Sequence, residues 1–229
     1  AGKILFNGQK ILEPKEVLVP GQDGISTVFQ DFQVQEHLTV QNNLFHEVNH
    51  LSVTQQKKIV SESIKVCQLL EVRNKFPAEI SGGQRQKLAL AKSLIANPEL
   101  ILLDEPFSHL DNISKSSFKE IITSLKAKGM SFVYVTHDVN DAVMYSDRVI
   151  VLKDGKIERD VVSVELFKNM HSIFIARLFN MNNIIVGGYL NQVFGFDLNE
   201  FSHYYVPQEA IEFNKSKGVS FVCSQCMNL

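Results

Sequence analysis

The sequence predicts an α/β fold with a parallel sheet, followed by a smaller β-rich region. Three observations point to the sheet, and all lie close together: Ser81-Gly82-Gly83 opens a helical pattern, Glu99 to Leu103 is a short apolar run, and Asp104 and Glu105 follow that run. Such runs are typical of parallel strands that are covered on both faces. Because open α/β sheets bind ligands at the carboxyl ends of their strands, we expect both acids at a binding site.

The start of the helix after Ser81 suits an anion. Helix N-termini present unpaired N–H groups and a partial positive charge, and glycines such as Gly82 and Gly83 let a large anion approach the backbone. The apolar face that indicates the helix consists of Leu88, Leu90, Ala91, Leu94 and Ile95. We therefore predict a phosphate site at this helix start.

Composition narrows the class of protein. The chain has 229 residues, 45% of them hydrophobic, and a formal net charge of −2. This is the balance of an ordinary globular protein, with no electrostatic attraction to nucleic acid or anionic lipid. Cys67, Cys223 and Cys226 make no disulfide framework, which fits a reducing cytosol. Cys223-x-x-Cys226 would be half a metal site, but no second ligand pair accompanies it, so we do not predict zinc.

The chain begins with an expected hairpin. Gly2 to Phe6 and Gln9 to Ile11 read as strands joined by the typical turn Asn7-Gly8. Gly2-Lys3 is not interpreted as a phosphate-binding loop, because Ile4 follows the lysine where Ser or Thr is needed. The sequence G-x-x-x-x-G-K-[ST] occurs nowhere in the chain.

A strand and a helical region come next. Ile25 to Phe29 is a short strand that ends at Gln30, and 32–70 is expected to be mostly helical. Ser52-x-x-Gln55 predicts a capping box at the start of a long helix. We expect that helix to run to about residue 70 and to bury Ile59, Val60, Ile64, Cys67 and Leu70.

The remaining elements follow Asp111. We predict, in order, a helix over 113–126 that stops near Gly129, a second buried strand over 131–136 that ends at His137, a hairpin of 147–152 with 156–159, two short helices within 164–179, and several short strands after residue 181.

Five of these segments resemble the nucleotide-binding domain of ABC transporters. They are VFQD at 28–31 (the Q-loop), ISGGQ at 80–84 (the signature), ILLDEP at 101–106 (the Walker B strand), SHLD at 108–111 and THD at 136–138 (the H-loop). The resemblance implies a partial P-loop NTPase-like ABC ATPase core over residues 1–178, with a helical subdomain over about 31–97. It also implies that ATP and Mg²⁺ are the cofactors.

The tail carries a second resemblance. MNNIIVG at 181–187 and YYVPQEAIEF at 204–213 resemble parts of the small OB-like (TOBE) regulatory domain of some import ATPases. We therefore expect an OB-like domain over 179–229 that ends early for a complete one. That subgroup imports sugars, polyamines, ferric iron and oxyanions, so the resemblance implies an importer and leaves its cargo open.

The family resemblance implies a role for each site residue. Asp104 and Gln30 would hold Mg²⁺, Glu105 would polarise or deprotonate the attacking water, and Gln30 and His137 would position the γ-phosphate. In a head-to-tail dimer the signature contacts the ATP of the second subunit, through Ser81, Gly82, Gly83 and Gln84, and Asp111 crosses the interface. A transmembrane permease would bind the helical subdomain, placing the chain at the cytoplasmic face of the membrane; no nucleic acid is expected.

The missing phosphate-binding loop leaves three explanations open. The chain is a fragment of a complete ATPase, which we favour because it begins without Met in mid-fold; or it is a degenerate partner that offers its signature to a competent subunit; or it is a regulatory scaffold. By itself we expect it to be inactive. An ABC-type ATPase acting on ribosomes or DNA is a further alternative, which the near-neutral charge disfavours.

Overall fold

The computed structural model describes residues 3–11, 22–108, 110–168 and 173–179, residue 192, and short strands between 184 and 228. The chain divides into two compact units, Ala1–His137 and Asp138–Leu229. The predicted domain boundary between residues 178 and 179 stays a prediction. No helix among these described residues is both long and apolar enough to cross a bilayer.

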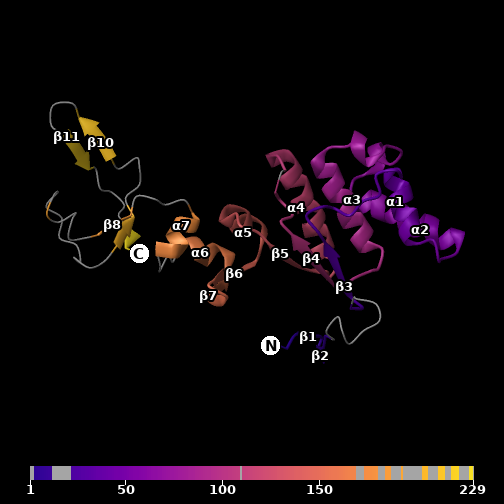
Figure 1. The fold of residues 1–229 in the computed structure, drawn as a ribbon, viewed down its shortest axis with the longest axis horizontal. Helices are drawn as coiled ribbons and strands as arrows, with labels where there is room; N and C mark the ends of the chain where they lie inside the picture. The colour runs from indigo at the N-terminus through magenta and orange to yellow at the C-terminus, as the bar shows by residue number, and fades with distance from the viewer. Residues whose placement is uncertain are drawn as a thin grey trace. The chain divides into compact units, whose positions relative to one another are not determined.

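A parallel sheet forms the centre of the first unit (Figure 1). Its strands are β3 (Ile25–Val28), β4 (Leu100–Asp104) and β5 (Ser131–Val135), in the order β3-β4-β5. Both pairings of β4 are parallel, and its Leu103 lies beside Val28 on one side and Tyr134 on the other. The predicted α/β class with a parallel sheet is confirmed.

The two strands that were expected to be buried differ. In β4 the side chains of Ile101 and Leu103 are 0% and 2% exposed. The prediction of a buried β5 was wrong. Successive side chains of a strand point to opposite faces of the sheet, and in β5 one of these faces is exposed. The Tyr134 ring packs edge-on against Phe107, with ring centroids 5.4 Å apart, whereas Val133 and Val135 are 54% and 64% exposed.

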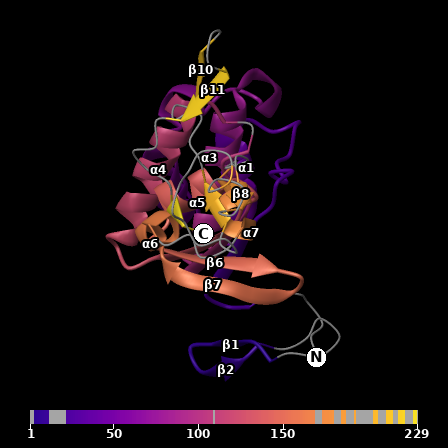
Figure 2. The ribbon, with the colours of Figure 1, turned by 90° about the vertical axis from the view of Figure 1, so that its left-hand side faces the viewer.

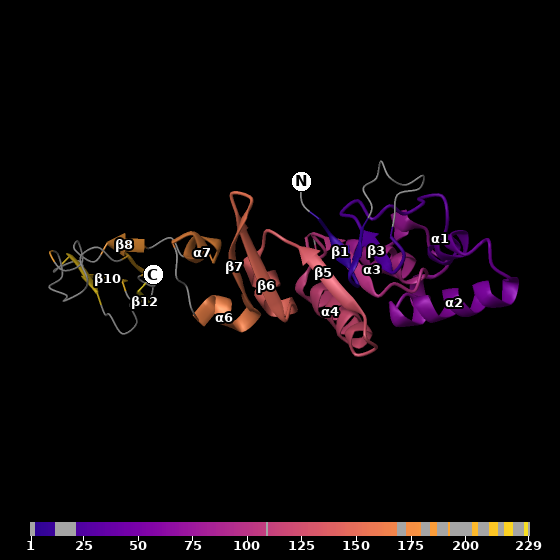
Figure 3. The same ribbon diagram turned by 90° about the horizontal axis from the view of Figure 1, so that it is seen from below.

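Four α-helices lie in the described part of the first unit. They are α1 (Val40–Glu47), α2 (Val53–Val66), α3 (Gly82–Leu94) and α4 (Asn112–Lys126), with single 3₁₀ turns at Leu70–Val72 and Pro77–Glu79. Helices α1, α2 and α3 pack on one another, and α4 contacts α3. Figure 3 shows α4 running alongside β5.

The start of α2 was predicted correctly and its end was not. Ser52 and Gln55 form the expected capping box. The helix stops at Val66, and Gln68 has a left-handed backbone with a φ of 56°, which turns the chain. As a consequence Leu69 is fully buried, whereas Leu70, predicted to be in the core, is 61% exposed.

The N-terminal hairpin is confirmed. Strands β1 (Leu5–Phe6) and β2 (Gln9–Lys10) pair antiparallel. Asn7 and Gly8 connect them with φ values of 49° and 77°, as a tight hairpin turn requires. The Asn7 side-chain amide donates to the Glu99 carboxylate over 2.9 Å, which links the hairpin to the residue before β4.

The second unit has a core of its own. It contains α5 (Val139–Tyr145), the antiparallel pair β6 (Arg148–Lys153) and β7 (Lys156–Val162), α6 (Ser163–Lys168) and α7 (Ile173–Leu178). Figure 2 shows the β6–β7 hairpin, which was predicted together with the two short helices. The buried residues of this unit's hydrophobic core are Val139, Val149, Val151, Leu166 and Ile175.

The tail contains short antiparallel strands. Strands β8 (Ile184–Val186), β9 (His203–Tyr205) and β12 (Met227–Asn228) form one sheet in the order β12-β9-β8, and β10 (Ile211–Asn214) pairs with β11 (Gly218–Phe221). Most of 179–229, including Cys223 and Cys226, lies outside the described residues. The OB-like assignment therefore stays a prediction.

Candidate functional site

The parallel sheet gathers polar residues at one edge. Asp104 is the last residue of β4, Gln30 lies two residues beyond β3, and His137 lies two residues beyond β5. Because the three strands run in the same direction, their carboxyl ends meet at this edge. Residues that are far apart in the sequence thus come together as the family resemblance implied.

Glu105 occupies a defined position directly after β4. Its backbone is left-handed, with a φ of 47°, and its N–H donates to the Val135 carbonyl over 2.9 Å. This conformation is uncommon for a residue other than glycine, and residues that adopt it are frequent at functional sites. Since β5 holds the Glu105 backbone directly, the carboxylate is oriented by the sheet rather than by a flexible loop.

The Glu105 carboxylate is bonded to the chain that follows β5. One of its oxygens, Oε1, lies 2.6 Å from His137 Nδ1 and accepts the His137 N–H over 3.0 Å. Its other oxygen accepts from the Thr136 hydroxyl over 3.3 Å. The Glu105 side chain is 17% exposed and that of His137 is 82% exposed. The carboxylate is therefore sheltered, while the imidazole faces outward.

This pair suits chemistry on a bound water and an anion. When both ring nitrogens of His137 carry a proton, Nδ1–H donates to the Glu105 carboxylate and Nε2–H remains as an outward donor. A fixed carboxylate can orient or deprotonate water, and a neighbouring imidazole can hydrogen-bond an oxyanion. Of the three side chains predicted as catalytic, Glu105 and His137 lie in direct contact, whereas Gln30 lines the cleft beside them.

A cleft of about 480 Å³ adjoins the strand ends. It is lined by the loop 29–33 together with Gly82, Asp104, Ser108 and Leu110. Three predicted site residues, Gln30, Gly82 and Asp104, therefore share one cavity. The carboxylate of Asp104 and the side-chain carbonyl of Gln30 are both exposed oxygen donors, the ligand type that Mg²⁺ prefers, so the donor set fits this ion.

The helix start beside the cleft is a capping box. The Ser81 hydroxyl accepts from the Gln84 N–H over 3.2 Å, and the Ser81 N–H donates to Gln84 Oε1 over 2.9 Å. Ser81 and Gln84, both predicted to bind nucleotide, thus also hold the first turn of α3. The hydroxyl of Ser81 still carries a proton that it can donate to an anion.

The two glycines of this turn have different surroundings. A Cβ added to Gly82 would have no atom within 4 Å, and Gly82 borders the cleft. A Cβ added to Gly83 would lie 2.7 Å from Ser114 Oγ and 2.9 Å from Ser114 Cβ. Gly83 is therefore required for the close approach of α3 and α4, whereas Gly82 leaves the backbone open to a ligand.

Asp111 caps helix α4. Its Oδ1 accepts from the Ser114 N–H over 2.7 Å. The pKa of the Asp111 carboxyl is lowered, first by the backbone N–H of Ser114, then by the Ser114 side chain and the Ile113 N–H. The structure thus assigns Asp111 a helix-capping position, and its predicted place at a dimer interface stays a prediction.

Sequence reasoning missed several residues around the site. Ser81-x-x-Gln84 has the same spacing as Ser52-x-x-Gln55 and could have been identified as a cap. The Gly83–Ser114 contact and the ammonium of Lys92, which reaches the Gln33 carbonyl over 2.7 Å, join residues far apart in the chain. No local pattern indicates contacts of this kind.

Comparison with known proteins gives a consistent result. The family profile described as ABC transporter matches residues 1–108. The spermidine/putrescine import ATP-binding protein PotA of Bacillus cereus is 34% identical over 190 residues, which cover 82% of this chain and 57% of the relative. The Fe(3+) ions import ATP-binding protein FbpC of Fusobacterium nucleatum is 33% identical over 192 residues, covering 81% and 50%. The chain thus spans about half the length of these curated relatives.

A solved structure shares the fold. The ATP-binding cassette MJ0796, determined as a dimer in a post-hydrolysis state bound to ADP and Pi, superposes with a TM-score of 0.61. It is 31% identical in sequence, and the match covers 71% of this chain and 74% of that one.

Proposed function

Because this chain belongs to the ABC transporter family, we propose that it is part of an ATP-binding and ATP-hydrolysing subunit that powers solute import through a membrane permease. The observation that carries the proposal is the contact of Glu105 with His137 at the sheet edge, next to a cleft that Gln30 and Asp104 line. The names of the two import relatives support the direction of transport.

The strand-end residues would act on the γ-phosphate and the attacking water. Glu105, held by the backbone of β5, orients or deprotonates the water, and His137 hydrogen-bonds the γ-phosphate. Asp104 and Gln30 supply the oxygen ligands for Mg²⁺, which when bound neutralises phosphate charge during the transfer. Catalysis of this kind depends mainly on positioning and on charge stabilisation, which fits a carboxylate with a fixed backbone.

The start of α3 would act on the nucleotide of a second subunit. In a head-to-tail dimer, the hydroxyl of Ser81 and the N–H groups of Gly82 and Gly83 would face the γ-phosphate, and Gln84 would hold Ser81 in place through the capping box. The open space around Gly82 supports this part of the proposal, because it leaves the backbone accessible. Asp111 would contribute to the same interface from the start of α4.

The transport partners follow from the same family. A permease would dock on the helical subdomain formed by α1, α2 and α3, which places the chain at the cytoplasmic face of a membrane. The two relatives are named for different cargoes, a polyamine and Fe(3+), so the proposal names import without a cargo.

A second candidate is a partner that donates only half of a site. The printed sequence has the signature and the strand-end residues but no G-x-x-x-x-G-K-[ST] loop. In this alternative the chain binds no ATP by itself and completes a site only against a subunit that carries the loop.

The experiment is a titration of Mg-ATP by calorimetry, with phosphate release followed in parallel. It is run on the chain alone and on the chain mixed with an ABC ATPase subunit that has the loop but an inactive signature. Millimolar or tighter binding of Mg-ATP to the chain alone, weakened at least tenfold by Asp104→Asn, supports the main proposal. Turnover in the mixture above that of the added subunit alone, lost in Ser81→Ala, favours the half-site alternative when the chain alone binds no ATP. Absence of both results overturns the proposal.

A further inference from the structure

The loop that carries Gln30 has a constrained backbone. Phe32 and Gln33 are consecutive residues with left-handed φ values of 61° and 44°. The Phe32 N–H donates to the Phe29 carbonyl over 3.0 Å, and the Gln33 N–H to the Asp31 carbonyl over 2.8 Å. Non-glycine residues adopt this conformation at a cost and retain it only where surrounding contacts hold it.

Lys92 provides such a contact. Its ammonium donates to the Gln33 carbonyl over 2.7 Å and forms an ion pair with Glu47 over 3.2 Å. The Lys92 side chain is only 15% exposed, so water competes weakly for these bonds. A hydrogen bond from a charged donor is stronger than one between neutral groups, and here it ties the loop to α1 and α3.

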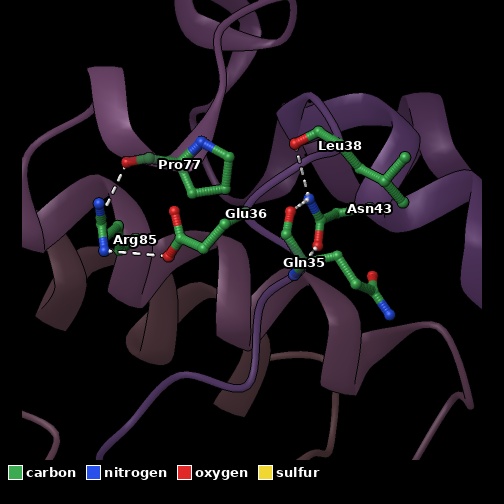
Figure 4. A network of polar contacts seen from close by, with 6 residues as sticks. All are labelled: Gln35, Glu36, Leu38, Asn43, Pro77 and Arg85. Carbon is green, nitrogen blue, oxygen red and sulfur yellow. Dashed lines mark hydrogen bonds and ion pairs between the residues drawn. The ribbon is translucent and has the colours of Figure 1, made fainter.

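The residues beyond the loop are anchored separately (Figure 4). Asn43, which is fully buried, accepts the Gln35 N–H over 2.8 Å and donates to the Gln35 carbonyl over 3.0 Å. The Arg85 guanidinium donates to the Pro77 carbonyl over 2.8 Å and pairs with Glu36 over 3.2 Å. These contacts fix the segment from residue 35 onward. The Lys92 bond acts two residues earlier, at the Gln33 carbonyl, and so lies closer to Gln30 along the chain.

We propose that Lys92 is a positioning residue for Gln30, acting through the Gln33 carbonyl. Helix α3 begins at Gly82 on the cleft and carries Lys92 in its last turn, so one rigid element borders the cleft and holds the loop that lines it. The structural part of the inference stands on the contacts alone. Its consequence for Mg²⁺ use rests on the proposed function.

The first test measures hydrogen exchange of the amides from Phe29 to Val34 in the whole chain. Lys92→Met keeps the aliphatic stem and removes the donor, so exchange should rise at least tenfold. Lys92→Arg restores a charged donor and should stay within about threefold of the unmodified chain. Lys87→Met is the matched control, since this lysine on the same helix donates to Gln68 and Ser117 and not to the loop.

The second test measures the Mg²⁺ concentration for half-maximal ATP hydrolysis in the complete assembly. We expect an increase of about fivefold or more in Lys92→Met and none in Lys87→Met or Lys92→Arg. Unchanged loop exchange in Lys92→Met, an equal rise in Lys87→Met, or freed loop amides with an unchanged Mg²⁺ requirement would each overturn the inference. Failure of the unmodified assembly to bind Mg-ATP would instead refute the proposed function, and the exchange result would still decide whether Lys92 holds the loop.

Discussion

The two halves of the candidate site are built in different ways. In the strand-edge half, formed by Gln30, Asp104, Glu105 and His137, the bonds of the Glu105 carboxylate join residues 31 and 32 positions apart. In the helix-start half, formed by residues 81–84, the capping bonds between Ser81 and Gln84 span three positions of the chain. The first half therefore exists only when the sheet is assembled, whereas the second is organised by one turn of helix.

Because of this difference, substitutions in the two halves should affect ATP turnover and stability differently. In the strand-edge half, the interacting groups are the ones that would perform the reaction, so substitution there should affect turnover first. In the helix-start half, the same groups also cap and pack a helix, so substitution should affect stability and ligand contact together. Each of the following substitutions tests that distinction.

The largest effect is expected for Glu105→Gln. The amide keeps the size of the side chain but cannot act as a base, so ATP hydrolysis in the complete assembly should fall about 100-fold or more. Nucleotide binding and the midpoint of chemical unfolding should change little. Glu99→Gln, at the other end of β4, is the control and should leave turnover intact. Equal turnover in Glu105→Gln and the unmodified protein would contradict the assigned role.

Substitution of the two glycines should separate packing from ligand access. Gly83→Ala places a methyl group within 3 Å of Ser114 and should lower the free energy of unfolding by about 1–3 kcal/mol. Gly82→Ala meets open space and should leave stability nearly unchanged while it weakens contact with the nucleotide. Chemical denaturation measures both variants. Rescue of Gly83→Ala by Ser114→Gly would confirm the steric cause, and equal destabilisation by both alanines would argue against it.

The Ser–Gln capping boxes of α2 and α3 form a matched pair. Ser81→Ala and Ser52→Ala each remove the hydroxyl that accepts an N-terminal N–H, and each should cost about 1 kcal/mol in unfolding free energy. Only Ser81→Ala should also reduce ATP turnover, because Ser81 adjoins Gly82 on the cleft, whereas Ser52 caps α2. A similar loss of turnover in both variants would mean that Ser81 contributes only through helix stability.

The smallest effect concerns Asp111 and pH. Because its pKa is lowered in the folded chain, the ionised carboxylate contributes stability that is complete above the unfolded value of about 3.9 and is lost as the pH falls through the folded pKa. Asp111→Ser keeps a cap that does not titrate. The stability difference between the two proteins should be constant from pH 7 to about 5 and should shift against the unmodified chain below about pH 4. Parallel curves down to pH 2 would show that this carboxylate is not coupled to folding.

Local patterns predicted most of the fold. The Ser52 capping box, the Asn7-Gly8 turn and the apolar run of β4 were confirmed because each depends on residues close in sequence. Leu70 was placed wrongly in the core because helical periodicity alone did not reveal that Gln68 turns the chain.

The rest depended on packing between distant segments. Val133 and Val135 are exposed although they belong to an apolar strand. Whether a side chain of β5 is buried depends on which other segments pack on its face, and no pattern within the strand indicates that. The contact of Lys92 with Gln33 joins positions 59 residues apart. That Gln30, Asp104 and His137 lie together at one edge of the sheet could be predicted because the sequence resembles a known family. The spacing of these residues alone would not have predicted their placement.

The left-handed backbone of Glu105 also limits how this protein can evolve. Glycine, asparagine and aspartate adopt such a φ most readily, whereas valine and isoleucine are disfavoured there by their branched Cβ. Natural variants that lack Glu105 should therefore carry one of a few small or polar residues at this position. The backbone conformation restricts the substitutions that position 105 tolerates, even where the carboxylate itself is not needed.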